Sequence, residues 1–311
     1  MHRFTVMLIS LAVLTVLVLL PCACGGGLFP DPNLETAVNE EIDRAREDNP
    51  EADYDDITGL TAIGKEIVDL RGLQYCTGLT TLCLASNSIS DISPLVNLSR
   101  LEELTLTWNQ VSDISTLSGL TSLKGLYLGD NRISDITPLA GLTGLTTLHL
   151  HNNQITGISP LSGLTDLTEL NLSYNLISDI SPLSGLTGLT TLSLYDNRVS
   201  DITPLAGLAS LTTLKLYDNE ISNISTLSRL TGLSVLGLSD NEISDLSPLS
   251  GLTNLMSLDL DGNEITDISP LVANSGLGAG DYLDLTDNPL STKSVKTYIP
   301  QLRNRGVNVQ W

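Results

Sequence analysis

The stretch LTTLHLHNNQITGISPLSGLTD, residues 145–166, is one copy of a 22-residue unit that occurs nine times between residues 79 and 276. Aliphatic side chains occupy the same positions in nearly every copy, and an asparagine marks the same place in each. These asparagines are Asn87, Asn109, Asn131, Asn153, Asn175, Asn197, Asn219, Asn241 and Asn263. An unbroken period of this length indicates that one short structural unit is stacked on the next many times over.

Each unit contains a short strand. Leu148 and Leu150 flank His149, and this alternation predicts a strand with its leucines inside and its histidine outside. Stacking then places the strands side by side in a parallel sheet. Asn153 follows where the chain must turn away, and its amide is expected to pair with buried backbone groups of neighbouring units. The pattern L-x-x-L-x-L-x-x-N-x-I/L at this period is typical of a leucine-rich-repeat solenoid.

The return segment of each unit, Ile-Ser-Asp-Ile-Ser/Thr-Pro-Leu, is too short for a regular α-helix and carries a proline in most copies. We therefore expect a 3₁₀-like turn on the outer side of the solenoid. The aspartate before this turn is expected to cap free N–H groups rather than to act in catalysis. This column contains Asp91, Asp113, Asp135, Asp179, Asp201, Asp245 and Asp267.

Both ends of the stack need covers, because an open solenoid exposes its hydrophobic column. Asp-Pro-Asn at residues 31–33 is a helix-start signal, which predicts a helical cap over residues 32–47. A second helix is expected over residues 292–305. The hydrophobic alternation that follows, VNVQW at residues 307–311, is expected to close the edge of the sheet.

These signals divide the chain of an α/β repeat protein into five parts. The parts are an export segment (1–24), a short tether (25–30), a helical N-terminal cap (31–56), the solenoid (57–290) and a C-terminal cap (291–311). Within the solenoid we expect a degenerate coil at 57–78, nine regular coils at 79–276 and an irregular last coil at 277–290. A solenoid core grows by stacking, so the solenoid and its caps form a single domain.

The repeat unit with N-x-I-S-D-I-S-P-L and the Asp-Pro-Asn-Leu-Glu start of the cap resemble the internalin-type leucine-rich-repeat proteins of bacterial surfaces. The resemblance covers residues 30 to about 290. It implies a curved right-handed solenoid with a concave parallel sheet and an extracytoplasmic role in recognition. Internalins commonly add an immunoglobulin-like domain and a wall-anchoring tail, which this sequence lacks, so their role in invasion is not implied.

The first 24 residues predict export from the cytoplasm. Arg3 precedes a nearly unbroken apolar run over residues 4–20, and Pro-Cys-Ala-Cys at residues 21–24 resembles a lipoprotein cleavage site, although Pro21 stands where an aliphatic residue is usual. Lipidation of Cys24 would tether the protein to a membrane. Ordinary secretion after cleavage, or retention of the run as an uncleaved anchor, are the alternatives. The expected location is extracytoplasmic, at the cell surface or in the cell envelope.

Charge and motifs exclude several functions. The formal net charge is −21, which argues against nucleic acid and anionic lipid as partners, because both require clustered Lys and Arg. Motifs such as G-x-S-x-G and H-E-x-x-H are absent from the sequence, so we expect neither enzyme activity nor a cofactor. Cys76 is expected in the core and Cys83 on an outward strand position, so a disulfide between them is not expected.

The candidate binding site follows from the outward strand positions, which should face the concave surface. Aromatic and histidine side chains gather at or beside these positions in six consecutive coils. The candidate ligand-binding residues are Trp108, Tyr127, His149, His151, Tyr174, Tyr195 and Tyr217. Exposed Tyr and Trp are over-represented at binding hot spots, so the pattern favours a protein, peptide or glycan ligand. A preference of strands for aromatic residues is the alternative explanation.

Three other hypotheses remain open at this stage. Asp196, Asp218 and Asp240 stand on adjacent coils and should repel one another unless they are solvated or neutralised by calcium. His149 and His151 share a strand face that could bind zinc, but the adjacent coils offer no obvious third ligand. The main alternative function is a structural or adhesive spacer of the cell envelope without a specific ligand.

Overall fold

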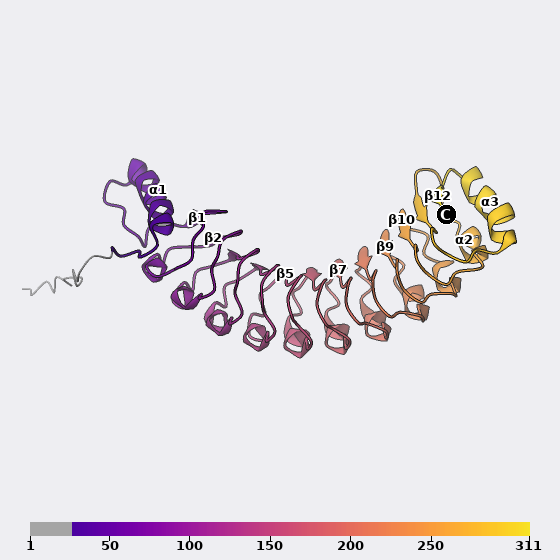
Figure 1. Cartoon of the computed structure of the whole chain (residues 1–311), viewed down its shortest axis with the longest axis horizontal. Helices are drawn as coiled ribbons and strands as arrows, with labels where there is room; N and C mark the ends of the chain where they lie inside the picture. Colours follow the sequence, from indigo (N-terminus) through magenta and orange to yellow (C-terminus); the bar gives the residue numbers. More distant parts are fainter. Residues whose placement is uncertain (1–26) are drawn as a thin grey trace, which may run out of the picture.

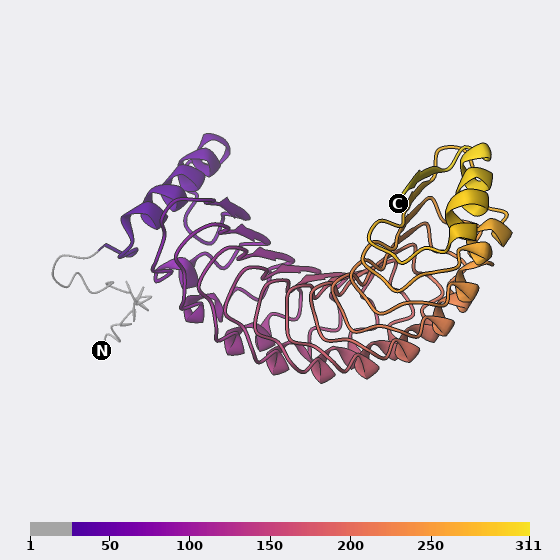
Figure 2. The same cartoon turned by 45° about the vertical axis from the view of Figure 1, so that its right-hand side comes forward.

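The computed structural model describes residues 27–311, which form one curved solenoid (Figure 1). Twelve strands, β1 to β12, make a single parallel sheet in chain order, and this sheet lines the concave side of the arc (Figure 2). The helical turns lie on the convex side, and a helix covers the N-terminal end. The expected leucine-rich-repeat architecture is therefore confirmed.

Each strand is only three residues long. The strands are β1 (Gly59–Thr61), β2 (Thr81–Cys83), β3 (Glu103–Thr105), β4 (Gly125–Tyr127), β5 (Thr147–His149), β6 (Glu169–Asn171), β7 (Thr191–Ser193), β8 (Thr213–Lys215), β9 (Val235–Gly237), β10 (Ser257–Asp259), β11 (Tyr282–Asp284) and β12 (Asn308–Gln310). The pairing register sets equivalent residues of successive coils directly beside each other, as for Leu126, Leu148 and Leu170.

The remaining elements are helical. The 3₁₀ turns are η1 (Leu73–Tyr75), η2 (Ser93–Leu95), η3 (Ser115–Gly119), η4 (Thr137–Leu139), η5 (Ser159–Gly163), η6 (Ser181–Gly185), η7 (Thr203–Gly207), η8 (Ser225–Arg229) and η9 (Ser247–Leu249). The α-helices are α1 (Pro32–Asp48), α2 (Ser269–Ala273) and α3 (Ile299–Asn304), and a π-helical turn, η10 (Ser294–Tyr298), precedes α3. The convex turns are thus 3₁₀ helices, as expected, except in the coil of α2.

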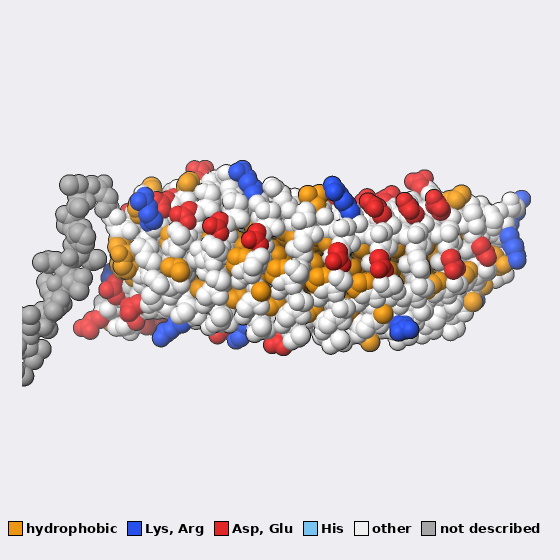
Figure 3. Space-filling model, turned by 90° about the horizontal axis from the view of Figure 1, so that it is seen from below, with side chains coloured by type: hydrophobic (Ala, Val, Ile, Leu, Met, Phe, Trp, Pro, Cys, Tyr) orange, Lys and Arg blue, Asp and Glu red, His pale blue; other side chains and the backbone are white. Residues whose placement is uncertain are grey.

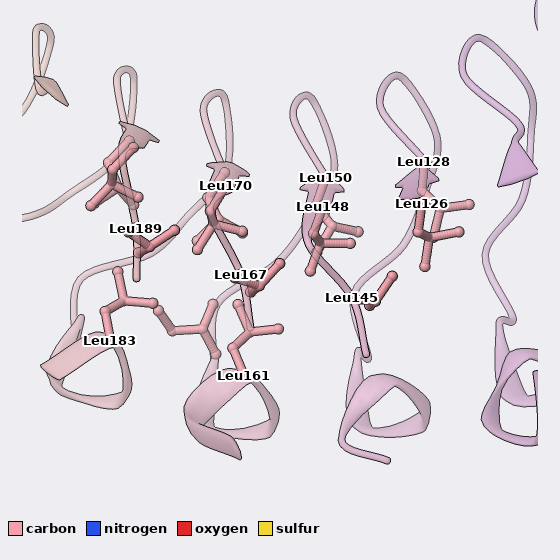
Figure 4. Close-up of a cluster of buried hydrophobic side chains, with 14 of the residues drawn as sticks. Leu126, Leu128, Leu145, Leu148, Leu150, Leu161, Leu167, Leu170, Leu183 and Leu189 are labelled. Carbon is pink, nitrogen blue, oxygen red and sulfur yellow. The ribbon is translucent and has the colours of Figure 1, made fainter. Parts of the chain in front are cut away.

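The core is a set of stacked leucine and isoleucine columns (Figure 4). Leu148 and Leu150 of one coil are fully buried, and so are Leu161 and Leu167 from its convex side and the next coil. Each coil buries its aliphatic residues against the coils on both sides, because one coil alone is too thin to enclose them. One continuous cluster of buried side chains therefore runs from Phe29 to Val309.

An asparagine ladder joins each coil to the one before it. Asn153 donates from Nδ2 to the carbonyl oxygens of Leu128, Leu150 and His151 at 3.0–3.2 Å, and its Oδ1 accepts the Ile133 N–H at 2.9 Å. The ladder extends from the coil of β2 to the coil of β11. These side chains satisfy backbone groups that a short strand leaves unpaired, which confirms their structural role.

The convex aspartates also act on the backbone. Asp179 Oδ1 accepts the N–H of Ser181 at 2.8 Å, and this bond, with a second one to the serine side chain, lowers the pKa of Asp179. The other six aspartates of the column make the same backbone contact. Seen from the convex side, red acidic side chains are spread along the molecule and basic ones are fewer (Figure 3).

One carboxylate fastens the N-terminal cap to the solenoid. Asp31 accepts the N–H groups of Asn33 and Leu34 at the start of α1, and its second oxygen accepts those of Val68 and Asp69 at 2.7 and 3.2 Å. Burial alone would raise the pKa of Asp31, but these four donors together lower it. The helix start predicted at residues 31–33 is therefore confirmed, and its cap also anchors the first coil.

The C-terminal cap agrees with expectation in its helix and differs at its last residue. Ser291 Oγ accepts the N–H of Ser294, and β12 pairs with β11 through Val309. Trp311, however, lies beyond the strand and is 45% exposed, with the Arg303 guanidinium 4.0 Å from its ring centre. The alternation therefore closes the sheet with its two valines, and the tryptophan does not enter the core.

The predicted export segment and its lipidation site Cys24 lie outside the described residues. Within residues 27–311, none of the helices combines the length and the hydrophobicity that crossing a bilayer requires. Cys76 is buried in the core, which raises the pKa of its thiol to about 12, and Cys83 is half-buried on the concave face; both are free thiols.

Candidate ligand-binding face

The seven predicted residues all lie along the concave side, where they form what we call the aromatic strip: Trp108, Tyr127, His149, His151, Tyr174, Tyr195 and Tyr217. They occupy three distinct columns. Tyr127 and His149 are the last residues of β4 and β5, and pair directly in the sheet. His151, Tyr195 and Tyr217 stand two residues further along their coils, and Trp108 and Tyr174 stand in the next column, in the turn before the ladder asparagine.

Neighbouring rings of the strip contact one another. The ring centres of Tyr195 and Tyr217 are 4.2 Å apart and the rings are stacked, while Tyr174 meets Tyr195 edge to face at 5.0 Å. Tyr127 and His149 form a similar edge-to-face pair at 5.0 Å. Such pairs stabilise each other's orientation, so the paired rings are held in place by one another.

Two tyrosine hydroxyls of the strip, those of Tyr127 and Tyr217, stay protonated in this setting. Burial, followed by the charges of Glu103 and Glu169, raises the pKa of Tyr127. Burial, followed by the nearby Tyr195 and Tyr174 hydroxyls and Asp218, raises the pKa of Tyr217. Neutral phenols act as hydrogen-bond donors, so this part of the strip offers a ligand both ring faces and hydroxyl groups.

The two histidines pair with different carboxylates. His149 Nε2 lies 2.9 Å from Glu169 Oε1, and His151 Nε2 lies 3.1 Å from Asp130 Oδ2. Their ring centres are 6.2 Å apart. Within residues 27–311, no three histidine, cysteine or acidic side chains come together as a metal ion would require, so neither the zinc nor the calcium hypothesis gains support. Each histidine is instead held by an acceptor on a neighbouring coil.

The residue before each ladder asparagine has a left-handed backbone. Together with Gly64, which precedes Lys65 at the equivalent place of the first coil, these residues form what we call the left-handed column: Gly64, Ser86, Trp108, Asp130, Asn152, Tyr174, Asp196, Asp218, Asp240, Gly262 and Asp287. Glycine, asparagine and aspartate tolerate this conformation best, which explains why the acids precede the asparagines. Trp108, at φ 59°, and Tyr174, at φ 53°, are the two bulky exceptions.

The two exceptions line one hollow in the concave surface, with a volume of about 460 Å³. Its lining is Trp108, Asp130, His151, Asn152 and Tyr174. Asn152 Nδ2 donates to Asp130 Oδ1 at 2.6 Å, so this carboxylate is held by Asn152 on one oxygen and His151 on the other. The sequence pattern had placed the aromatics on the concave side but had not identified this polar floor.

A glycine makes the floor possible. Gly129 lies beneath the His151 ring, and a methyl group on Gly129 would sit only 2.2 Å from its Cε1 atom. The ring therefore occupies the space of a missing side chain on the neighbouring coil. His151 Nδ1 is buried without a hydrogen-bond partner, and so is the hydroxyl of Ser173 beside it.

Beyond the aromatic strip, the concave face becomes acidic. Burial raises the pKa of Asp240 and Asp261, and the charges of nearby aspartates add to this effect. Among the described residues, neither carboxylate has a lysine or arginine within ion-pairing distance. The face therefore has an aromatic part over β3 to β8 and an acidic part over β9 to β11.

Comparison with known proteins places this geometry in context. A family model described as leucine-rich repeats (2 copies) matches residues 77–119, 143–185, 187–229 and 231–273. No curated protein gives a significant match. Among solved structures, an internalin (inlF) from Listeria monocytogenes is 34% identical, with a TM-score of 0.73; the match covers 91% of this chain and 92% of that one.

Two further structures extend the comparison. Internalin C2 from the same organism is 40% identical with a TM-score of 0.64, and the match covers 68% of this chain and 95% of that one. The plant peptide hormone receptor RGFR1, solved in complex with RGF2, is 26% identical with a TM-score of 0.62, and the match covers 70% and 38% of the two chains.

Proposed function

The chain belongs to the internalin-type leucine-rich-repeat proteins, and from this premise we propose that it is an extracytoplasmic module that binds a protein, peptide or glycan on its aromatic strip. The observation that carries the proposal is the continuity of the strip. Tyr174, Tyr195 and Tyr217 contact one another across three coils and remain partly exposed on the concave face. Large, ordered, exposed rings are the usual anchors of protein recognition.

Binding suits this geometry better than catalysis. The strip lies on an open sheet, whereas acid–base and nucleophilic catalysis gain most from a site that excludes water. The related fold of the plant receptor occurs in a complex with RGF2, which supports a peptide or protein as one class of ligand. The aromatic strip supplies the contact area that such a ligand requires.

The alternative is an envelope spacer without a ligand. In that case the exposed rings would be present only because aromatic residues favour strand formation. The preference of strands for aromatic residues does not explain Tyr174, however, because this residue lies in a left-handed turn outside the strand. This observation favours a ligand over a spacer.

The test is a binding screen of the full chain against arrayed glycans and cell-surface proteins. The Tyr195→Ala/Tyr217→Ala variant should lose the interaction while its circular dichroism spectrum stays unchanged. Tyr75→Ala/Tyr298→Ala is the matched control, because it removes two tyrosines that lie outside the strip. Binding that survives in the first variant, or that disappears equally in both, would contradict the proposal.

We also propose that the protein is exported and that lipidation of Cys24 tethers it to a membrane. The domain boundaries given above are part of this proposal. The support is the sequence of residues 1–24 and the surface or receptor setting of the related structures. Cys24→Ser should release the protein from the membrane fraction. Mass spectrometry of the variant should also lack the added mass of a diacylated cysteine. An unchanged distribution with no lipid mass on the parent chain would leave secretion or an uncleaved anchor as the explanation.

A further inference from the structure

The left-handed column contains residues that suit its backbone conformation and two residues that do not. Eight of its eleven members are glycine, asparagine or aspartate, which suit a positive φ, and a ninth is the small residue Ser86. Trp108 and Tyr174 do not suit it, and their side chains are 62% and 47% exposed, so they recover little by burial. Strained residues of this kind cluster at functional sites, so the two outliers point to this part of the face.

Both strained rings border the same hollow, on coils three units apart. The turns after β4 and β5 lie between them and provide its floor of Asp130, His151 and Asn152. At about 460 Å³ the hollow has the size of a small-molecule site. Two aromatic walls and a hydrogen-bonding floor thus line a hollow that adjoins the stacked pair Tyr195 and Tyr217 through the contact between Tyr174 and Tyr195.

The charges of the hollow favour a neutral ligand. None of its five lining residues is a lysine or arginine, so an anion finds no counter-charge there. The single carboxylate, Asp130, already interacts with Asn152 and His151 and is almost fully buried, so a cation gains little from it. The lining of the hollow therefore favours an uncharged ligand.

The floor holds two acceptors for hydroxyl groups, an exposed one on Asn152 and a buried one on His151. His151 Nε2 faces the Asp130 carboxylate, which assigns the ring proton to Nε2 and leaves Nδ1 as a bare acceptor without a partner. Asn152 uses its NH₂ group on Asp130 and leaves its carbonyl oxygen facing away from that bond. Both acceptors belong to residues that line the hollow together with Trp108 and Tyr174.

We propose that this hollow is a subsite for a neutral saccharide unit. A sugar ring has a flat face of C–H groups that packs on Trp108 or Tyr174, and hydroxyl groups that donate to Asn152 and, after a small shift of the ring, to His151. The saccharide belongs either to a free polysaccharide or to a glycan on a protein. The inference rests on the proposed binding function and names the chemistry of one part of the face.

The experiment uses the full chain in lauryldimethylamine oxide, a detergent without a sugar headgroup, and the background variant Trp311→Phe. Trp108 is then the sole tryptophan, and its fluorescence reports on the hollow. The probes are neutral oligosaccharides of glucose, galactose, mannose and N-acetylglucosamine, followed by a glycoprotein before and after enzymatic deglycosylation. Binding of a probe should shift the emission of Trp108 and protect it from acrylamide quenching.

Calorimetry of variants then locates the site. Trp108→Asn and Tyr174→Asn should each weaken saccharide binding about tenfold or more, because each removes one wall while suiting the left-handed backbone. Tyr75→Asn is the control for loss of an exposed aromatic elsewhere. Binding of oligosaccharides alone identifies a polysaccharide ligand, and loss of glycoprotein binding on deglycosylation identifies a protein-borne glycan.

Several results would overturn the proposal. With the probes, these results are the absence of binding to any neutral oligosaccharide, a requirement for a charged sugar, and binding to the deglycosylated protein alone. With the variants, the result is saccharide binding that survives both Trp108→Asn and Tyr174→Asn. A ligand that depends on Tyr195 and Tyr217 but not on Trp108 and Tyr174 would reject the saccharide subsite and leave the proposed binding function intact. Binding that survives in both pairs of variants would reject the saccharide subsite and the proposed binding function together.

Discussion

Asn152 and Asn153 are neighbours in the chain and identical in type, yet they belong to two different columns. Asn153 is a rung of the ladder, with four hydrogen bonds to backbone groups of two coils. Asn152 is exposed, has a left-handed backbone and makes one hydrogen bond to Asp130. The ladder column keeps one residue type because folding fixes it, whereas the left-handed column sets only a backbone requirement and leaves the side chain free for binding.

The largest expected effect is the difference between the two alanine variants. Asn153→Ala leaves the Ile133 N–H without its acceptor and removes three further bonds, so we expect a loss of about 3 kcal/mol in the free energy of unfolding. Asn152→Ala should cost about 1 kcal/mol, because alanine tolerates the left-handed region poorly. Urea denaturation of both variants measures the difference. Equal losses would mean that the two columns do not differ as described.

The second expected effect has the opposite sign. Trp108→Asn should raise the free energy of unfolding by about 1 kcal/mol, since asparagine suits φ 59° and the exposed ring contributes little packing. The reverse exchange at an equivalent position, Asp196→Trp, should lower it by a similar amount. Thermal unfolding of the two variants tests the pair. Destabilisation by Trp108→Asn would show that the ring supports the fold and would remove the argument from strain.

The smallest expected effect concerns the acidic part of the face. The folded-state pKa of Asp240 and Asp261 is raised, so their contribution to stability is fully present below the ordinary pKa of 3.8 and is lost as the pH rises through the folded value. Asp240→Asn/Asp261→Asn should therefore be more stable than the parent at pH 7, by about 0.5 kcal/mol after solvent screening. This advantage should disappear near pH 3 and shrink in 0.5 M salt. A pH-independent difference would contradict the charge mechanism.

The sequence predicted the solenoid almost completely because its aliphatic positions recur at a fixed period. Leu148, Leu150 and Asn153 define one coil, and the pairing of equivalent residues then follows for the others. The cap start at Asp31 was also predictable, although its contact with Val68 was not, because that bond joins the cap to a coil 37 residues further along the chain. Local sequence patterns predict local structure. Contacts between segments far apart in the chain can be predicted only when the register of the coils is also known.

The candidate face was predicted only in outline. The aromatic columns followed from strand alternation, but the partners of the histidines did not, since Glu169 and Asp130 lie 20 and 21 residues away in the chain. The positive φ before each asparagine had a detectable signal in Gly64 and Gly262, which share the column with the aspartates. The aspartates of the column by themselves resemble a solvated acidic edge. The strain at Trp108 and Tyr174 is therefore visible only in the structure.

The ladder has a consequence for how the molecule opens. The Leu150 carbonyl oxygen accepts from both Asn153 and Asn175, so each rung shares an acceptor with the next and couples nearest neighbours only. Such a one-dimensional array frays from its ends, where a coil has a neighbour on one side. Amide hydrogen exchange should therefore be fastest toward both termini and slowest over β5 to β7. The centre of the aromatic strip coincides with this slowest-exchanging stretch, so its rings should keep their arrangement while the ends of the solenoid open and close.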